Sequence, residues 1–284
     1  MPSPAEHRKQ FIKAFESLAR HRERHDVFAD FLEMAVCAIR KRTMPPGPEA
    51  DGIEAKYMAV VKRNRPDDVR QMPTLLGITT LAVQDGGCDF LGQVAGDLEL
   101  VTGHMGQFFT PYDVSRMIAE MTLDTVAEII AGQGFVTVQE PACGAGGMII
   151  AAADVLARKG FDIGTQLYIE AIDISPMCFR MSYLQASLRG IPATIRRGNT
   201  LSLEMFDHGV TPAFFGFYAA RKEAFDLWRS GEGRGSTSFD AEITQQNAAA
   251  EPPHQPGPVA PNRPPPSRDK PPKVSQPRQL DLFG

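Results

Sequence analysis

The sequence lacks three features that mark common classes of protein. Its four cysteines are scattered with no CxxC pair, which argues against a zinc ribbon or a disulfide scaffold and fits a reducing cytoplasm. No apolar run reaches the roughly eighteen residues of a membrane span, and the N-terminus carries no apolar signal region. The net charge of −4 argues against a strongly basic nucleic-acid binder but allows local basic patches. We therefore expect a cytoplasmic protein with no membrane partner.

Apolar residues are plentiful, whereas the prolines are unevenly placed. Hydrophobic residues make up 43% of the 284 positions, enough for a packed core. Eleven of the 23 prolines lie between Pro252 and Pro277, in a stretch with no apolar cluster to offset its ordering entropy. These shifts predict four parts: a helical region at 1–100, a folded domain at 101–230, a disordered proline-rich linker at 231–278 and a terminal peptide at 279–284.

The first hundred residues show helical periodicity. Phe11, Phe15 and Leu18 share one helical face, and a second apolar face follows the charged run 20–25. Prolines at 45, 46 and 48 end that second segment. Further helices are predicted at 53–63, 72–84 and 111–121.

The spacing of apolar residues changes after Gly134 from a helical pattern to short strand-like runs. Short β-branched and aromatic runs predict strands at 135–139, 167–172 and 193–196. An alanine-rich helix at 147–158 and a second helix at 176–189 separate them. Strands that alternate with helices predict parallel βαβ units, and hence an α/β fold.

A glycine-rich turn joins the first predicted strand to its helix. Residues 140–147 read Glu-Pro-Ala-Cys-Gly-Ala-Gly-Gly, and Asp173 ends the next strand. Glycines allow a ligand to approach the backbone closely, and a carboxylate at the second strand end can bind ribose hydroxyls. Tight strand–helix packing is the alternative. A nicotinamide site fits less well, because Ile149 stands where GxGxxG has its third glycine.

Three blocks in residues 106–205 resemble the N6-adenine DNA methyltransferases, in particular the catalytic subunit of type I restriction–modification systems. The sequence GQFFTP at 106–111 matches a block that precedes the glycine-rich turn in this family. The segment 140–147 matches its S-adenosylmethionine motif, with Glu140 as the acidic residue before the proline. Gly198-Asn199-Thr200-Leu201 matches the block after the third strand, which is often GDTL.

This resemblance implies a Rossmann-like, S-adenosylmethionine-dependent core over 101–230, shortened because only three or four of the usual seven strands fit. Asn199 stands where many relatives have Asp, and it can still pair with an exocyclic amine. The resemblance assigns cofactor contacts to Phe109, Thr110, Pro111, Glu140, Pro141, Ala142, Gly144, Gly146, Asp173 and Asn199. Cys143 lies inside the turn, where we expect a small turn residue rather than a nucleophile.

The family's catalytic block, Asn/Asp-Pro-Pro-Tyr/Phe, does not occur in the sequence. In the family that block accepts the hydrogens of the adenine amine and stacks on the flipped base. Its nearest counterpart is Thr211-Pro212-Ala213-Phe214. Thr211, Pro212 and Phe214 are therefore the catalytic candidates, while the aromatic spacing over 213–228 favours a helix that packs in the core.

The chain ends Gln279-Leu280-Asp281-Leu282-Phe283-Gly284, which resembles the QLxLF motif that binds the bacterial sliding clamp. Leu280, Leu282 and Phe283 would fill apolar pockets, and Gln279 would hydrogen-bond at the rim. A chance apolar tail is the alternative. The exposed position of these residues after a polar linker favours clamp binding.

Basic residues form local clusters within this acidic chain. One follows the first helix at Arg20, Arg22 and Arg24, and Arg196 and Arg197 follow the third strand. The latter pair would meet DNA phosphate or cap the strand. The six histidines show no ligand spacing, so we predict no metal.

Together these features predict an adenine-N6 DNA methyltransferase-family protein of the bacterial cytoplasm, associated with the nucleoid. It would bind S-adenosylmethionine and double-stranded DNA and be tethered to the replication sliding clamp. A catalytically inactive adaptor is the first alternative. The second is an antirestriction or regulatory subunit that pairs with a specificity subunit or a second methyltransferase chain.

Overall fold

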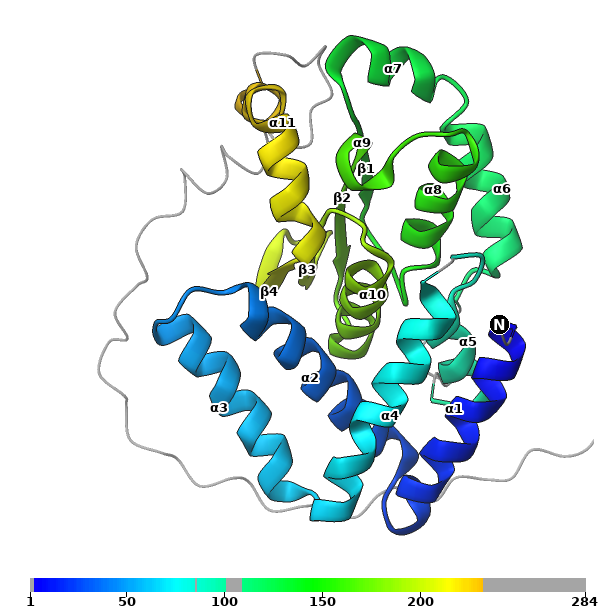
Figure 1. The fold of residues 1–284 in the computed structure, drawn as a ribbon, viewed down its shortest axis with the longest axis vertical. Helices are drawn as coiled ribbons and strands as arrows, with labels where there is room; N and C mark the ends of the chain where they lie inside the picture. Colours follow the sequence, from blue (N-terminus) through cyan, green and yellow to red (C-terminus); the bar gives the residue numbers. More distant parts are fainter. Residues whose placement is uncertain (1–2, 85, 101–108, 232–284) are drawn as a thin grey trace, which may run out of the picture. The chain divides into compact units, whose positions relative to one another are not determined.

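The computed structural model describes residues 3–84, 86–100 and 109–231 (Figure 1). All of them fall within a single compact unit. The predicted linker beyond Gly231 and the predicted clamp-binding peptide lie outside the described residues. No helix among the described residues is long and apolar enough to cross a membrane.

The N-terminal third is built of helices, as the periodicity predicts. They are α1 (Pro4–Leu18), the short 3-10 turn η1 (Ala19–His21), α2 (Arg24–Thr43), α3 (Pro48–Arg63), α4 (Pro66–Val83) and α5 (Phe90–Asp97). The predicted helices at 53–63 and 72–84 begin earlier than expected, at Pro48 and Pro66. Proline fits the first helical turn, where its missing N–H has no partner to lose.

The remaining described residues alternate between helices and strands. In chain order they form α6 (Tyr112–Thr122), α7 (Val126–Gln133), β1 (Val136–Glu140), α8 (Gly147–Arg158), α9 (Ile163–Gln166), β2 (Leu167–Asp173), α10 (Pro176–Arg189), β3 (Ala193–Asn199), β4 (Glu204–Val210) and α11 (Pro212–Ser230). The bounds of α8 and α10 agree with the prediction. Helix α10 carries clear end signals, because Ser175 caps its start and Gly190 ends it at φ 75°.

The four strands form one sheet in the order β1-β2-β3-β4. The first three are parallel, as predicted, and β4 runs antiparallel to β3. Strand β4 was not predicted, because its sequence Glu-Met-Phe-Asp-His-Gly-Val is largely exposed and shows no clean apolar alternation. Strand β3 also extends three residues beyond its predicted end, to Asn199. The mixed α/β class is confirmed.

Both faces of the sheet are covered. Leu167, Ile169 and Ala171 on one face of β2 join the main core, which also contains buried residues of α8, α10 and the N-terminal helices. Tyr168 on the other face joins Phe135 and two phenylalanines of α11 in a separate aromatic cluster. This alternation is the period-2 pattern of a strand buried on both sides. Because both faces are covered, the ends of the strands are left as the accessible parts of the sheet.

Candidate functional site

Predicted cofactor residues meet at one edge of the sheet. Strands β1, β2 and β3 are parallel and end at Glu140, Asp173 and Asn199, respectively. Their carboxyl ends therefore lie side by side. Crevices at this edge of an open α/β sheet are where ligands commonly bind.

The turn between β1 and α8 depends on two glycines with positive φ. Gly144 has φ 53° and Gly146 has φ 103°. A Cβ on Gly146 would lie 3.2 Å from the Cα of Ser182 in α10, and a Cβ on Gly144 would lie 3.1 Å from the ring of Phe109. The turn is therefore packed closely against its neighbours, with Gly144 half-buried and Gly146 and Gly147 buried at the start of α8.

Asp173 fastens this turn to the end of β2. Its Oδ2 accepts a hydrogen bond from the Gly144 N–H at 2.8 Å, and its Oδ1 accepts one from the Ser175 N–H at 2.8 Å. The carboxylate is about nine-tenths buried. Each carboxylate oxygen keeps a second lone pair for a ligand hydroxyl. Asp173 therefore orders the turn and stays available as an acceptor.

Phe109 connects the GQFFTP segment to the same turn. Its ring lies against Gly144 and packs on the main core. Thr110 and Pro111 are exposed just before α6. Residues 106–108 of the block lie outside the described residues. The structure thus brings together two blocks that are more than thirty positions apart in the sequence.

The third block, Gly198-Asn199-Thr200-Leu201, lies at the end of β3 and contacts the turn that follows β1. The Thr200 hydroxyl donates to the Pro141 carbonyl at 2.6 Å. Asn199 uses its side-chain carbonyl to accept from the Leu201 N–H at 2.9 Å, so its amide NH2 group is the part left to face a ligand. The Glu140 carboxylate accepts from the Ala142 N–H at 3.1 Å. The ends of β1 and β3 are tied together through this turn.

Two buried polar residues that no motif marks also hold the turn. The Gln185 side chain in α10 donates to the Ala145 carbonyl at 2.8 Å and to Asp89 Oδ1 at 2.8 Å. Burial raises the pKa of Asp89 above its ordinary value, against the opposing effect of hydrogen bonds from Gln185 and Gly92. A glutamine within a mostly apolar buried helix face is the sequence signal that could have found this network.

Cys143 is a structural member of the turn. Its side chain is buried, and that burial raises the pKa of its thiol well above the ordinary value. A thiol held in its neutral form is a poor nucleophile. The expectation of a small turn residue fits this environment.

The catalytic candidates lie at the other edge of the sheet. The Thr211 hydroxyl is fully buried, donates to the Ile191 carbonyl at 2.7 Å and accepts from the Ala193 N–H at 2.9 Å. Ala193 begins β3, so Thr211 and the adjoining Pro212 sit at the amino end of the parallel strands. The Phe214 ring packs on Tyr168 at 5.7 Å. The structure does not bring these residues to the carboxyl ends of β1, β2 and β3, and it favours the core-packing interpretation of this segment.

Arg196 and Arg197 point to opposite faces of β3. Arg196 pairs with Glu170 at 3.3 Å on the side of the aromatic cluster. Arg197 lies on the side of α10 and lines a cavity there. Within the described ranges, no group of three or more His, Cys, Asp or Glu side chains is arranged to hold a metal ion.

Fold and site together define an α/β protein with a glycine-rich turn at the carboxyl ends of three parallel strands. Residues 97–226, a little under half of the chain, match the N-6 DNA methylase family. The chain is also 33% identical over 91 residues to the type I restriction enzyme MjaIX methylase subunit of Methanocaldococcus jannaschii. That match covers 32% of this chain and 14% of the relative. The chain matches no solved structure.

Proposed function

We propose that this chain binds S-adenosylmethionine at the turn between β1 and α8, and that it acts on double-stranded DNA as an adenine-N6 methyltransferase-family protein. The observation that carries the proposal is the convergence of Phe109, Gly144 and Asp173 at one strand edge. The neighbour order β3-β2-β1 is that of one half of a Rossmann-like sheet. The family match over the same residues supports it.

The residues present fit this cofactor. When bound, S-adenosylmethionine supplies a methyl group already activated by its sulfonium charge. The positive-φ glycines let the backbone approach it, and Asp173 has acceptor capacity for ribose hydroxyls. Glu140 would supply a negative charge for the cationic cofactor, and the Phe109 ring, which lies against Gly144, would cover one side of the turn. Thr110, Pro111, Pro141, Ala142, Gly146 and Asn199 complete the proposed contact set.

Calorimetric titration with S-adenosylmethionine tests the site directly. We expect micromolar binding by the wild type and loss of binding in Asp173→Ala. Asp162→Ala is the matched control, because Asp162 is also a turn carboxylate that accepts from a backbone N–H, that of Gly164 at 2.9 Å. Equal affinity of the Asp173 and Asp162 variants would refute the assignment of the ribose site.

A second function, a catalytically silent adaptor or regulatory subunit, is favoured by one observation. The sequence has no Asn-Pro-Pro-aromatic block, and the nearest counterpart, at Thr211, is buried at the wrong edge of the sheet. Methylation of bacterial DNA by the purified chain separates the two functions. Transfer of labelled methyl groups to adenine by the chain alone excludes the silent adaptor.

A partner subunit is part of this proposal. The curated relative is named as a subunit of a type I restriction enzyme, so we propose a specificity or second methyltransferase subunit as the partner of this chain. Methyl transfer that appears only after co-purification with a second methyltransferase chain would support the regulatory role.

We further propose that residues 279–284 bind the bacterial sliding clamp and place the protein at the nucleoid in the cytoplasm. The proposal rests on the sequence Gln-Leu-Asp-Leu-Phe, with Leu282 and Phe283 as apolar anchors. The proline-rich part of the linker, residues 252–277, would span at most about 80 Å if it were extended. Such a tether would raise the local concentration of the folded domain near DNA.

A further inference from the structure

A cavity of about 350 Å³ lies between the helices α2, α3 and α10 and the paired strands β3 and β4. Its lining carries five cationic side chains, namely Arg40, Lys56, Arg63, Arg180 and Arg197. Only two carboxylates, Glu33 and Asp207, belong to the same lining. The cavity therefore has an excess of positive charge within a protein whose net charge is −4.

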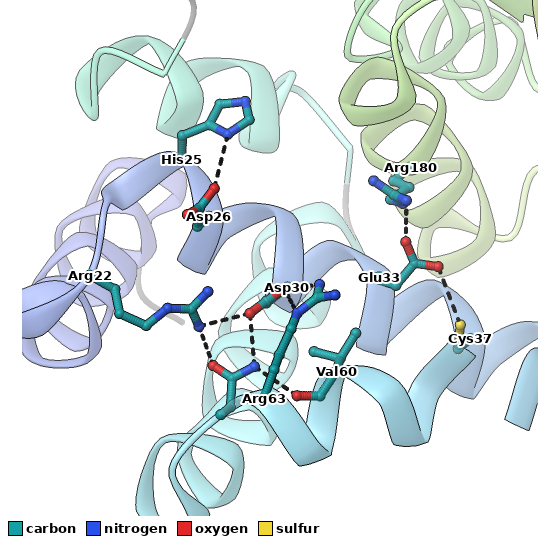
Figure 2. Close-up of polar contacts among 10 residues, drawn as sticks. Arg22, His25, Asp26, Asp30, Glu33, Cys37, Val60, Arg63 and Arg180 are labelled. Atoms are coloured by element: carbon teal, nitrogen blue, oxygen red, sulfur yellow. Dashed lines mark hydrogen bonds and ion pairs between the residues drawn. The ribbon is translucent and has the colours of Figure 1, made fainter. Parts of the chain in front are cut away.

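The carboxylates around the cavity neutralise only some of these cations. Glu33 pairs with Arg180, as Figure 2 shows. Asp207 is shared, because its oxygens lie 3.3 Å from Arg40 and 3.9 Å from Lys56.

Asp30 lies outside the lining of the cavity. Its carboxylate forms ion pairs with Arg63 and with Arg22 (Figure 2). These ion pairs hold four of the five cationic side chains in place and leave a surplus of positive charge.

Two arginines have unused binding capacity. The Arg197 guanidinium lies 5.2 Å from the centroid of the Phe206 ring, and within the described part of the chain it has no carboxylate partner. The Nε–H of Arg40 is buried and has no hydrogen-bond partner among the described residues. A buried charged donor without an acceptor is costly, and an anion in the cavity would satisfy it.

The cavity adjoins the proposed cofactor edge. Arg197 in β3 stands opposite Asp173 in β2 in the strand register. Pro176, the first residue of α10 after β2, also belongs to the lining. A ligand in the cavity would therefore lie beside the proposed S-adenosylmethionine site, on the face of the sheet that carries α10.

We propose that this cavity binds a phosphate group of a DNA strand and positions that strand beside the cofactor edge. The inference rests on the proposed function and names how its substrate is held. Its lining contains no Gly, Ser or Thr, the residues that typically cradle a nucleotide phosphate through backbone N–H groups. Charged side chains over apolar walls such as Val36 and Phe179 suit the sequence-independent contacts that position a DNA backbone.

The test is fluorescence anisotropy of a labelled DNA duplex of mixed sequence, titrated with the full chain at several salt concentrations. We expect Arg197→Gln and Lys56→Gln each to weaken binding by about three- to tenfold and to lower the salt slope by about 1. Arg229→Gln is the matched control, because Arg229 also lies over an aromatic ring, that of Phe225 at 6.0 Å. Equal affinities of the Arg197 and Arg229 variants would overturn the proposal.

Competition distinguishes a DNA strand from a free phosphate compound. Unlabelled duplex should displace the labelled duplex, whereas inorganic phosphate and deoxyadenosine monophosphate should not do so at micromolar concentration. Displacement by the monophosphate alone, lost in Arg197→Gln, would assign the cavity to a free nucleotide and refute the proposal.

Titration of the same variants with S-adenosylmethionine separates this inference from the proposed function. Cofactor binding with no Arg197 effect on DNA binding would refute this inference alone. Arg197-dependent DNA binding by a chain that binds no cofactor would refute the proposed cofactor site and leave the cavity assignment standing.

Discussion

At Gly146, backbone conformation and packing both exclude a side chain. Its φ of 103° is one that L-residues rarely adopt, and a Cβ would lie 3.2 Å from the backbone of Ser182. We expect Gly146→Ala to lower the free energy of unfolding by about 1–3 kcal/mol and to abolish cofactor binding, as measured by urea unfolding and calorimetry. Gly132→Ala, in helix α7 with open space at its Cβ, should stabilise the protein or leave it unchanged.

Asp30 makes the stability of the N-terminal helices depend on pH. Burial alone raises the pKa of its carboxyl group, but hydrogen bonds from Arg63, Asn64 and Arg22 outweigh burial and leave that pKa below the ordinary value. The charged form is thus favoured in the folded state. Its stabilisation is complete above the ordinary carboxyl pKa of about 4, and it is lost as the pH falls below that value through the lowered pKa of the folded state.

We therefore expect the wild type to lose more unfolding free energy than Asp30→Asn between about pH 5 and pH 3. At neutral pH the variant should be less stable by about 1–3 kcal/mol, because the carboxylate accepts hydrogen bonds from α3 and η1–α2 that an amide satisfies only partly. Urea unfolding at several pH values measures both effects. Asp67→Asn, at an exposed pair with Arg70, is the control. A parallel pH profile for wild type and Asp30→Asn would contradict this account.

At the scale of single elements, helix α11 is attached to the sheet by aromatic packing. Phe217 is fully buried, and its ring lies 5.3 Å from Phe135 and 5.6 Å from Tyr168. Phe217→Ala should cost about 3–5 kcal/mol of unfolding free energy. Phe215→Ala, two positions earlier and about half exposed, should cost less than about 1 kcal/mol.

The same pair of variants tests whether α11 serves chemistry. Because the aromatic cluster lies at the amino ends of the strands, Phe217→Ala should leave the affinity for S-adenosylmethionine unchanged at temperatures where the variant is folded. A clear drop in that affinity in folded Phe217→Ala, absent from Phe215→Ala, would show that the α11 end of the sheet belongs to the cofactor site.

At the scale of the whole molecule, the folded unit and the terminal peptide should act independently. Leu282→Ala combined with Phe283→Ala should weaken association with the purified bacterial clamp by at least about tenfold, because two apolar anchors are lost. Surface plasmon resonance with immobilised clamp measures this change. The double variant should keep the wild-type affinity for S-adenosylmethionine, and substitution of Asp281 by Ala serves as the control within the motif. Clamp binding that survives the double substitution would remove the basis for a tethered enzyme.

Local signals in the sequence were sufficient for the elements that surround the glycine-rich turn. The bounds of α8 and α10 follow from an alanine-rich run and from the caps Ser175 and Gly190. The glycine-rich turn and the strand-end Asp173 carry their own chemistry, because a positive φ requires glycine and a strand-end carboxylate is an acceptor. These features are encoded within a few neighbouring positions.

Other features depended on contacts between distant positions. Strand β4 exists because β3 offers it a hydrogen-bonding edge, and the Gln185–Asp89 link to the turn joins residues 96 positions apart. The different roles of Arg196 and Arg197 follow from the alternation of side chains across β3 once both faces are covered. The sequence alone determined the glycine turn, its partner carboxylate and the family blocks, because these are local. Only the tertiary structure decided that Thr211 lies at the opposite edge and that five cations share one cavity, because burial and charge proximity are set by packing between elements.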